Sequence, residues 1–199
     1  MYNQRIERNI IANIGKIDKA TLSDIYHVSE YCADIQRDMQ RKEMSTKPDS
    51  FYMKRQTEIN ENVRAILVDW LISVHLKFKL LPETLYITVN LIDRYFSMFN
   101  VQKSQVQLVG IAALLIATKY EEIYPPTVKE FIYLTDDTFT RKEVLEMERK
   151  ILFNIEFGIT ETSSYRFLER YSKIAKADSV IFFLAQYLLE LALLDSKMN

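Results

Sequence analysis

Residues that interrupt helices are scarce in this sequence, which has 3 Gly and 4 Pro among its 199 residues. Gly and Pro are the least favourable residues in a helix interior and are among the commonest in tight turns. A chain with so few of them is expected to form long helices. Hydrophobic residues make up 48% of the sequence, enough for such helices to bury a substantial core. The sequence therefore predicts an all-α fold.

The spacing of apolar residues divides the chain into four segments. Residues 1–22 show weak periodicity and are expected to form a flexible tail. Residues 23–60 should hold one helix over 23–42, with Ser23 as its N-cap, and a polar connector that contains Pro48. Residues 61–158 should form a first helical unit, and residues 159–199 only part of a second one.

Five helices are expected in the first unit and two in the second. Those of the first unit should cover about 62–78, 83–99, 104–120, 127–135 and 141–155, with connections short enough to make successive helices neighbours. Ser104 is the expected N-cap of the third helix, and Thr140 with Glu143 has the spacing of a capping box at the last one. In the second unit, Thr162 or Ser163 should cap a helix that ends near residue 174, and another helix should span 178–194.

The helix expected over 62–78 carries apolar residues on nearly all sides, which indicates a helix surrounded by others at the centre of a bundle. Four of these residues form a stripe with the helical spacing i, i+3, i+4, i+7. Either all four are core residues, which is the commoner situation, or the stripe stays exposed as a docking groove. The stripe consists of Val63, Ile66, Leu67 and Trp70.

Four charged residues, each in a different helix, lie inside strongly apolar predicted helices: Arg64, Asp93, Lys119 and Glu148. An unpaired charge buried there would be costly, so ion pairs are expected. Arg64 and Asp93 form a natural buried pair because their helices are neighbours in the sequence. Lys119 and Glu148 either form a simple salt bridge or together offer a donor and acceptors to the backbone of a partner.

Catalytic, metal-binding and nucleic-acid-binding functions find little support in the sequence. Its two histidines, His27 and His75, lie near no plausible nucleophile or metal cluster, and it has no Gly-rich phosphate loop or C-x-x-C motif. We therefore expect no catalytic residue, metal or cofactor. The net charge of −1 gives no basic excess for binding nucleic acid or an anionic membrane. Cys32 is the sole cysteine, so no intramolecular disulfide can form, and a reducing location in the nucleus and cytoplasm is expected.

Four ordered segments resemble the cyclin family, and the similarity extends over roughly residues 25–194. They are VRAILVDWL (63–71), LPETLYITVNLIDRYFS (81–97), QLVGIAALLIATKYEEIYPP (107–126) and FIYLTDDTFTRKEVLEMERKIL (131–152). The stretches KYEEIYPP and LTDDTFT point to the mitotic A/B type, while LKFKLLPETLY and LLELALLD lean towards the B-type. The resemblance implies a cyclin fold, in which a five-helix cyclin box follows an N-terminal helix and precedes an incomplete second box.

The resemblance also implies a function, that of an activating subunit which forms a heterodimer with a cyclin-dependent protein kinase at G2/M. It implies that Arg64 and Asp93 form the ion pair that holds the cyclin box together. Lys119 and Glu148 match the pair that grips the mobile regulatory helix of the kinase. Further kinase contacts are implied at Tyr120, Leu152 and Ile159 and, through a looser alignment, at Ile35 and Tyr31.

A substrate-docking patch is implied as well, one that recognises arginine-x-leucine motifs in substrates or inhibitors. Two positions depart from the family pattern: Val63 replaces the usual Met, and Ser73 stands where A-type cyclins carry an acidic residue. Docking of basic motifs is therefore expected to be weaker or altered. The residues that match the patch are Val63, Ile66, Leu67, Trp70, Val106 and Gln107.

Both ends of the chain admit more than one interpretation. RNIIANIG (8–15) faintly resembles the destruction box of mitotic cyclins, with Ile11 in place of the usual Leu, and the alternative is an ordinary flexible tail. The helix that contains residues 187–194 is apolar on most faces, so this end is expected to be poorly ordered or to associate. A truncated chain, a shortened gene product and a covering partner are the open explanations.

Two other functions remain as alternatives to kinase activation. The first is a transcription-type cyclin-fold adaptor that binds nucleic acid, which would need a basic face that the neutral charge balance does not offer. The second is a purely structural helical scaffold.

Overall fold

All regular structure in the described part of the chain is helical, which confirms the predicted all-α fold. The computed structural model describes residue 18, residues 31–160 and residues 162–196. Ser23, the 1–22 segment and the 8–15 motif thus lie outside the described residues. The described elements are α2 (Cys32–Thr46), η3 (Tyr52–Arg55), α3 (Glu61–Phe78), α4 (Pro82–Met98), η4 (Lys103–Gln105), α5 (Val106–Glu121), α6 (Val128–Tyr133), α7 (Arg141–Asn154), α8 (Ser164–Ala175) and α9 (Ser179–Ala192).

Local capping signals set most helix starts. The predicted capping box at α7 is confirmed: the Thr140 side chain accepts a hydrogen bond from the Glu143 backbone N–H, and the Glu143 side chain accepts one from the Thr140 N–H. Ser163, one of the two candidates for α8, accepts from the backbone N–H of Arg166. The other candidate, Thr162, instead donates its hydroxyl hydrogen to the Met39 carbonyl of α2, at 3.0 Å.

The prediction that Ser104 caps a helix is wrong. Residues Lys103–Gln105 form a 3₁₀ turn, and α5 begins only at Val106, with no side-chain cap hydrogen bond at its start. The polar connector predicted after the first helix is also more structured than expected. α2 continues to Thr46, and η3 lies within the connector and places Tyr52 in the core, where the side chain is 2% exposed.

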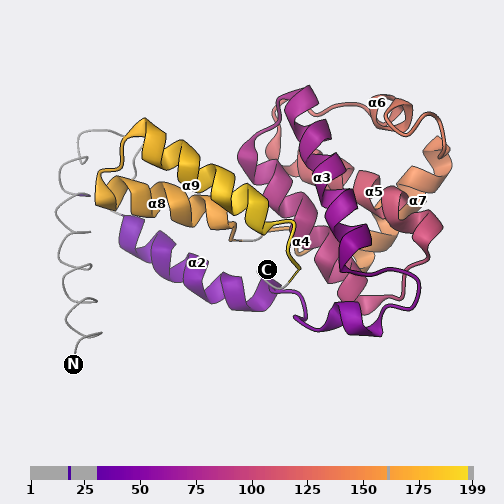
Figure 1. Ribbon diagram of the computed structural model, residues 1–199, viewed down its shortest axis with the longest axis horizontal. Coiled ribbons are helices and arrows are strands. Elements are labelled where there is room, and N and C mark those ends of the chain that lie inside the picture. The colour runs from indigo at the N-terminus through magenta and orange to yellow at the C-terminus, as the bar shows by residue number, and fades with distance from the viewer. Residues whose placement is uncertain (1–17, 19–30, 161, 197–199) are drawn as a thin grey trace.

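The centre of the bundle is α5, not the helix over 62–78 that we had expected there. α5 runs through the middle of the group formed by α3, α4, α6 and α7 (Figure 1), and its residues from Leu108 to Thr118 are all buried. α3 buries one face and leaves Ile66 and Leu76 exposed on others. Small residues explain the difference, because Gly110 and the alanines of α5 allow neighbouring helices to approach from every side.

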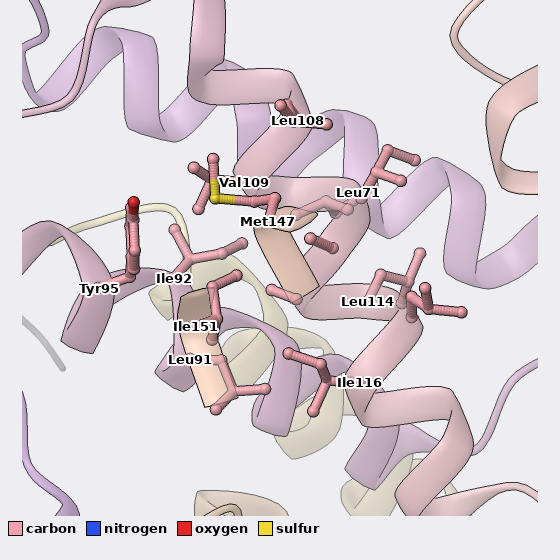
Figure 2. Close-up of a cluster of buried hydrophobic side chains, with 14 of the residues drawn as sticks. Leu71, Leu91, Ile92, Tyr95, Leu108, Val109, Leu114, Ile116, Met147 and Ile151 are labelled. Atoms are coloured by element: carbon pink, nitrogen blue, oxygen red, sulfur yellow. The ribbon is translucent and has the colours of Figure 1, made fainter. Parts of the chain in front are cut away.

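The main hydrophobic core lies where α3, α4, α5 and α7 meet. Figure 2 shows its members pointing toward one another: Leu71 comes from α3, Leu91 and Ile92 from α4, and Met147 and Ile151 from α7, around the side chains of α5. Each fully buried Leu or Ile contributes about 1.5–3 kcal/mol relative to an exposed one. This core therefore fixes α5 and α7 against each other, and these two helices carry the predicted kinase-binding pair.

The second unit rests on the first through α3 and α4. A small buried cluster joins the two units, with Val68, Leu85, Tyr86, Val89 and Leu193 as its buried members. Arg166 at the start of α8 forms an ion pair with Glu83 at the start of α4, at 2.8 Å. α2 lies beside α8 (Figure 1), and its Met39 carbonyl accepts a hydrogen bond from Thr162 in the segment that joins α7 to α8. Among the described helices, none is both long enough and apolar enough to cross a bilayer.

Candidate functional site

Lys119 and Glu148 form a salt bridge between the last turn of α5 and the middle of α7. The Lys119 Nζ donates to Glu148 Oε1 at 2.6 Å. The two side chains differ in exposure: Lys119 is 47% exposed and Glu148 13%. The pair is therefore formed within the chain and still reachable from solvent on its lysine side.

Lys119 also lies where a positive charge is favourable. It sits in the last turn of α5, whose C-terminal carbonyl groups carry the negative end of the helix dipole. The Lys119 ammonium group has three N–H donors, so it can donate further hydrogen bonds while one N–H is bonded to Glu148. The arrangement can thus bind a backbone carbonyl or carboxylate of another molecule without prior rearrangement.

The other predicted kinase contacts lie close in sequence to Lys119 and Glu148. Leu152 and Ile159 are half-buried and pack against the main core, so each presents only part of its side chain to the outside. Tyr120 is 47% exposed, and its hydroxyl is hydrogen-bonded to the Thr160 hydroxyl at 2.7 Å. That bond connects the end of α5 to the segment that follows α7.

Two exposed aromatic residues in this region were not among the site residues predicted from the sequence. Phe153 and Phe157 are 65% and 59% exposed, and their rings meet edge to face at 5.6 Å. Glu156 and Phe157 both have positive φ, at 53° and 57°, a left-handed conformation that non-glycine residues rarely adopt. A chain reversal held in such a conformation beside exposed aromatic surface is typical of a binding site. The available signal was two Phe residues around the predicted end of a helix at 155.

The two predicted contacts near the start of α2 belong to a helix that passes close to this surface. Tyr31 and Ile35 are 58% and 44% exposed. Further along α2, the Met39 carbonyl accepts a hydrogen bond from Thr162, in the same segment after α7 that bonds the Tyr120 hydroxyl. The exposed side of α2 therefore continues from the end of α5 towards Ile35 and Tyr31.

The predicted docking residues lie on α3 and at the start of α5 but differ widely in exposure. Ile66 is 71% exposed, whereas Leu67 and Val106 are 5% and 6% exposed. Val63, Trp70 and Gln107 are half-buried. The exposed stripe expected on α3 is therefore narrower than predicted: Leu67 and Val106 support it from below, and Ile66 supplies most of its apolar surface.

Gly110 explains how Leu67 fits under this surface. A methyl group built on the Gly110 Cα would lie 2.8 Å from Leu67 Cδ1, closer than side-chain carbons normally approach. The absence of a side chain at Gly110 thus lets α3 and α5 pack closely at this point. Sequence reasoning did not single out Gly110, although a glycine inside an apolar helix is a signal of close packing.

Arg64 and Asp93 form the ion pair that the sequence predicted, and both are fully buried, at 0% and 1% exposure. Arg64 Nε donates to Asp93 Oδ1 at 2.6 Å, and its Nη2 donates to Oδ2 at 2.7 Å. Tyr52 donates its hydroxyl hydrogen to Asp93 Oδ1 at 2.6 Å. Burial, and after it the charge of Asp93, raises the pKa of Tyr52. The remaining Arg64 nitrogen, Nη1, donates to the Leu193 carbonyl just after α9, at 2.7 Å.

Nothing in this arrangement suggests acid–base or metal chemistry. Residue 18 and ranges 31–160 and 162–196 contain no group of three or more His, Cys, Asp or Glu residues placed to hold a metal ion. In the Arg64–Asp93 and Lys119–Glu148 ion pairs, each carboxylate is already bonded to a basic side chain of the same chain. The exposed features are an accessible lysine and apolar side chains, which suit protein binding.

Comparisons with known proteins agree with the sequence resemblance. Residues 34–160 match the family model "Cyclin, N-terminal domain", and residues 162–199 match "Cyclin, C-terminal domain". A G2/mitotic-specific cyclin-A of Hydra viridissima is 45% identical over 89% of this chain and 43% of its own length. A G2/mitotic-specific cyclin-B of Dictyostelium discoideum is 44% identical over 86% of this chain and 39% of its own.

The fold likeness extends to a solved structure. A viral cyclin from Herpesvirus saimiri superposes with a TM-score of 0.72 at 24% identity, over 80% of this chain and 71% of that one. The chain spans less than half the length of the two relatives named above. Their nearly equal identities do not separate the A type from the B type, so the lean towards the B-type stays a prediction.

Proposed function

Because this chain belongs to the cyclin family, we propose that it is a non-catalytic subunit that binds and activates a cyclin-dependent protein kinase at G2/M. The observation that carries the proposal is the salt bridge of Lys119 and Glu148, held rigidly by α5 and α7 yet exposed on its lysine side. The similar proteins are named as G2/mitotic-specific cyclins, which supports the same cell-cycle stage.

Activation follows from selective binding of one kinase conformation. A protein kinase is inactive when its regulatory helix is swung out, because the Lys–Glu ion pair of its active site is then broken. A rigid surface that binds only the swung-in helix shifts the equilibrium towards the active state. Lys119 and Glu148 would fix that helix through charge-assisted hydrogen bonds.

The available apolar surface is large enough for this shift. Moving a kinase from 1:99 to 99:1 active requires about 5.5 kcal/mol of differential binding. A well-buried apolar side chain contributes about 1.5–3 kcal/mol before the cost of ordering. A few anchors are therefore sufficient, and the candidates are Tyr120, Leu152 and Ile159 together with Phe153 and Phe157.

The direct test is kinase activation by the purified chain in which Lys119→Ala and Glu148→Ala are combined. Activation should be lost while the far-UV circular dichroism spectrum stays unchanged, since neither residue belongs to the core. The matched control is Lys142→Ala with Glu146→Ala, an exposed pair on α7 whose charged atoms are 3.8 Å apart. The control should activate normally; full activation by the first variant would show that the salt bridge does not bind the kinase.

Phe157 offers a second test of the same surface. Phe157→Ser removes an exposed ring, so it should weaken kinase binding by at least tenfold in a titration, with little effect on stability. Phe51→Ser is a suitable control because Phe51 is similarly exposed, at 63% against 59%, and lies before η3. Equal affinities of the two variants would remove Phe157 from the interface.

We infer that the surface of α3 recruits substrates or inhibitors with arginine-x-leucine motifs. Ile66→Ser should reduce phosphorylation of a motif-bearing substrate and spare a short peptide without the motif; Trp70→Ala should do the same, provided that it folds. Leu76→Ser alters a residue of the same helix that is 65% exposed and lies outside the patch, so it should affect neither. An equal loss on both substrates would refute the docking role.

The single cysteine supports our inference that the chain works in the reducing nucleus and cytoplasm. Imaging of the fluorescently tagged chain through the cell cycle tests this location. Exclusion of the tagged chain from both compartments would contradict it.

A further inference from the structure

A cleft lies at the C-terminal ends of α3 and α5, in the first unit. The turn that joins α3 to α4 forms one wall, and the loop that joins α5 to α6 forms the other. Figure 1 shows α6 and the C-terminal end of α3 at the same edge of the molecule. The volume of the cleft, about 430 Å³, falls within the range of ligand-binding pockets. Its apolar lining comes mainly from Phe78, Leu81, Ile123, Tyr124, Pro125 and Pro126.

Internal hydrogen bonds hold both walls of the cleft in place. Glu122 Oε1 accepts a hydrogen bond from the Leu81 backbone N–H at 2.7 Å and another from the Thr84 hydroxyl at 2.6 Å. These bonds tie the loop after α5 to the first turn of α4. At the other end of the loop, Thr127 and Glu130 form the capping box of α6. The cleft is therefore formed before a ligand arrives, which lowers the cost of ordering on binding.

The cleft has highly exposed apolar side chains on both walls. Ile123 and Tyr124 are 85% and 92% exposed, and Leu81 on the opposite wall is 43% exposed. Pro125 and Pro126 follow Tyr124 and restrict the backbone there. Single exposed apolar residues are common on protein surfaces, but a concave group of them from two segments is typical of a binding site.

The charged residues at the cleft favour a basic ligand. Glu122 and Glu130 line it, and each uses one carboxylate oxygen in the hydrogen bonds described above. Neither forms an ion pair with a residue that the structure describes, and Lys79 is the one basic residue of the lining. Burial, and after it the charge of Glu83, raises the pKa of the neighbouring Glu121, in keeping with acidic surroundings. A phosphate-bearing ligand would be repelled here.

We propose that this cleft binds an extended peptide segment of a partner protein, in which a large apolar side chain adjoins a Lys or Arg. The apolar side chain packs between Leu81 and Tyr124, on opposite walls. The basic side chain reaches the remaining carboxylate oxygens of Glu122 and Glu130 and donates charge-assisted hydrogen bonds to them. A short segment is sufficient, because neither wall has to move to receive it.

The cleft is separate from the proposed kinase and substrate surfaces. Trp70, the patch residue of α3 nearest to the cleft in sequence, precedes Phe78 by eight residues, or about 12 Å along the helix. None of the lining residues belongs to the proposed kinase-binding surface around Lys119 and Glu148. The inference therefore goes beyond kinase activation and does not depend on it.

Subtractive selection from a phage-displayed library of random linear peptides provides the test. The library is first depleted on a chain that combines Leu81→Ser with Tyr124→Ser, and then selected on the wild-type chain. We expect enriched peptides in which a large apolar residue adjoins Lys or Arg. In anisotropy titrations with the labelled peptides, Tyr124→Ser should weaken binding about tenfold or more. Tyr133→Ser is the matched control, because Tyr133 is 69% exposed on α6 and lies outside the cleft.

Two glutamine substitutions isolate the contribution of charge. Glu122→Gln and Glu130→Gln each keep an oxygen that can accept the hydrogen bonds of the walls, and glutamine also completes a capping box. A chain with both substitutions should bind the selected peptides about tenfold more weakly at low salt, and most of the salt dependence of binding should disappear.

Four results would overturn the proposal. The depleted library may enrich no peptide on the wild-type chain, or the selected peptides may bind the double glutamine variant as tightly as the wild type. Displacement of the peptides by saturating kinase would assign the cleft to the kinase surface, and loss of binding in Ile66→Ser would assign the peptides to the α3 patch. The chain with Lys119→Ala and Glu148→Ala should bind the peptides normally, so a failure of kinase activation leaves this test unaffected.

Discussion

Replacement of Asp93 by Asn should remove a large part of the stability of this chain. The substitution keeps the shape of the side chain but removes the charge that compensates the Arg64 guanidinium, which is completely buried. Asn also offers one acceptor oxygen where the carboxylate offers two. An amide oxygen at the Oδ1 position can still accept from Tyr52 and Arg64 Nε, but Arg64 Nη2 then faces an N–H₂ donor in place of its acceptor.

The expected loss is about 3–5 kcal/mol, the usual cost of leaving one buried charge without its partner. Domains of this kind unfold with a free energy of roughly 5–15 kcal/mol, so the loss is a large fraction of the total. Urea unfolding followed by far-UV circular dichroism measures it as a lower midpoint at constant slope. A loss below about 1 kcal/mol would show that the buried charge is compensated in another way and would refute the reasoning.

A double-mutant cycle separates the ion pair from the rest of the site. Arg64→Met should also destabilise the chain, because it leaves the Asp93 carboxylate buried. The combined variant contains neither charge, so it should lose less than the two single losses together, with a coupling of about 1–3 kcal/mol. Additive losses would mean that the two side chains do not stabilise each other.

Three further changes have distinct expected outcomes. Burial lowers the pKa of His75, although Glu190 and Glu122 oppose the shift. As the pH falls below about 6.5, the unfolded chain therefore binds a proton at this histidine before the folded chain does, so the free energy of unfolding should drop. His75→Gln should flatten that drop. Gly110→Ala should push Leu67 outward and weaken substrate docking. Its overpacking cost of about 1–3 kcal/mol in stability is partly offset by the better helix propensity of Ala, worth about 1 kcal/mol. Thr140→Ala should lower the free energy of unfolding by about 1 kcal/mol in urea titrations, since it removes the α7 capping box. Thr57→Ala before α3 removes one exposed hydrogen bond with Asn100 and no helix cap, so it should lower the free energy of unfolding less.

Elements with local signals could be predicted from the sequence. The start of α7 was predictable because Thr140 and Glu143 bond to each other's backbone within one turn. α4 begins at Pro82, one residue before the predicted start, and proline suits the first helical turn. The α8 start was narrowed to two residues, and Ser163 and Thr162 have the same chemistry, so only the fold decides between them.

Features that depend on long-range contacts could not be predicted in the same way. The hydrophobicity of α3 indicated a central helix, but small side chains rather than hydrophobic ones decided that α5 takes that place. Tyr52 looked like part of a polar connector because its partner, Asp93, lies 41 residues later. The pairing of Lys119 with Glu148 was one of two interpretations, and only the packing of α5 on α7 brings the charges to 2.6 Å.

The hydrogen bond from Arg64 to the Leu193 carbonyl has a consequence for unfolding cooperativity. If α9 detached from α3 and α4, the guanidinium would lose one buried acceptor while it stayed inside the first unit. Detachment of the second unit therefore weakens the centre of the first, and amide protons in the two units should exchange with similar free energies of opening. Although the chain is matched by two family models, it should melt as one cooperative body.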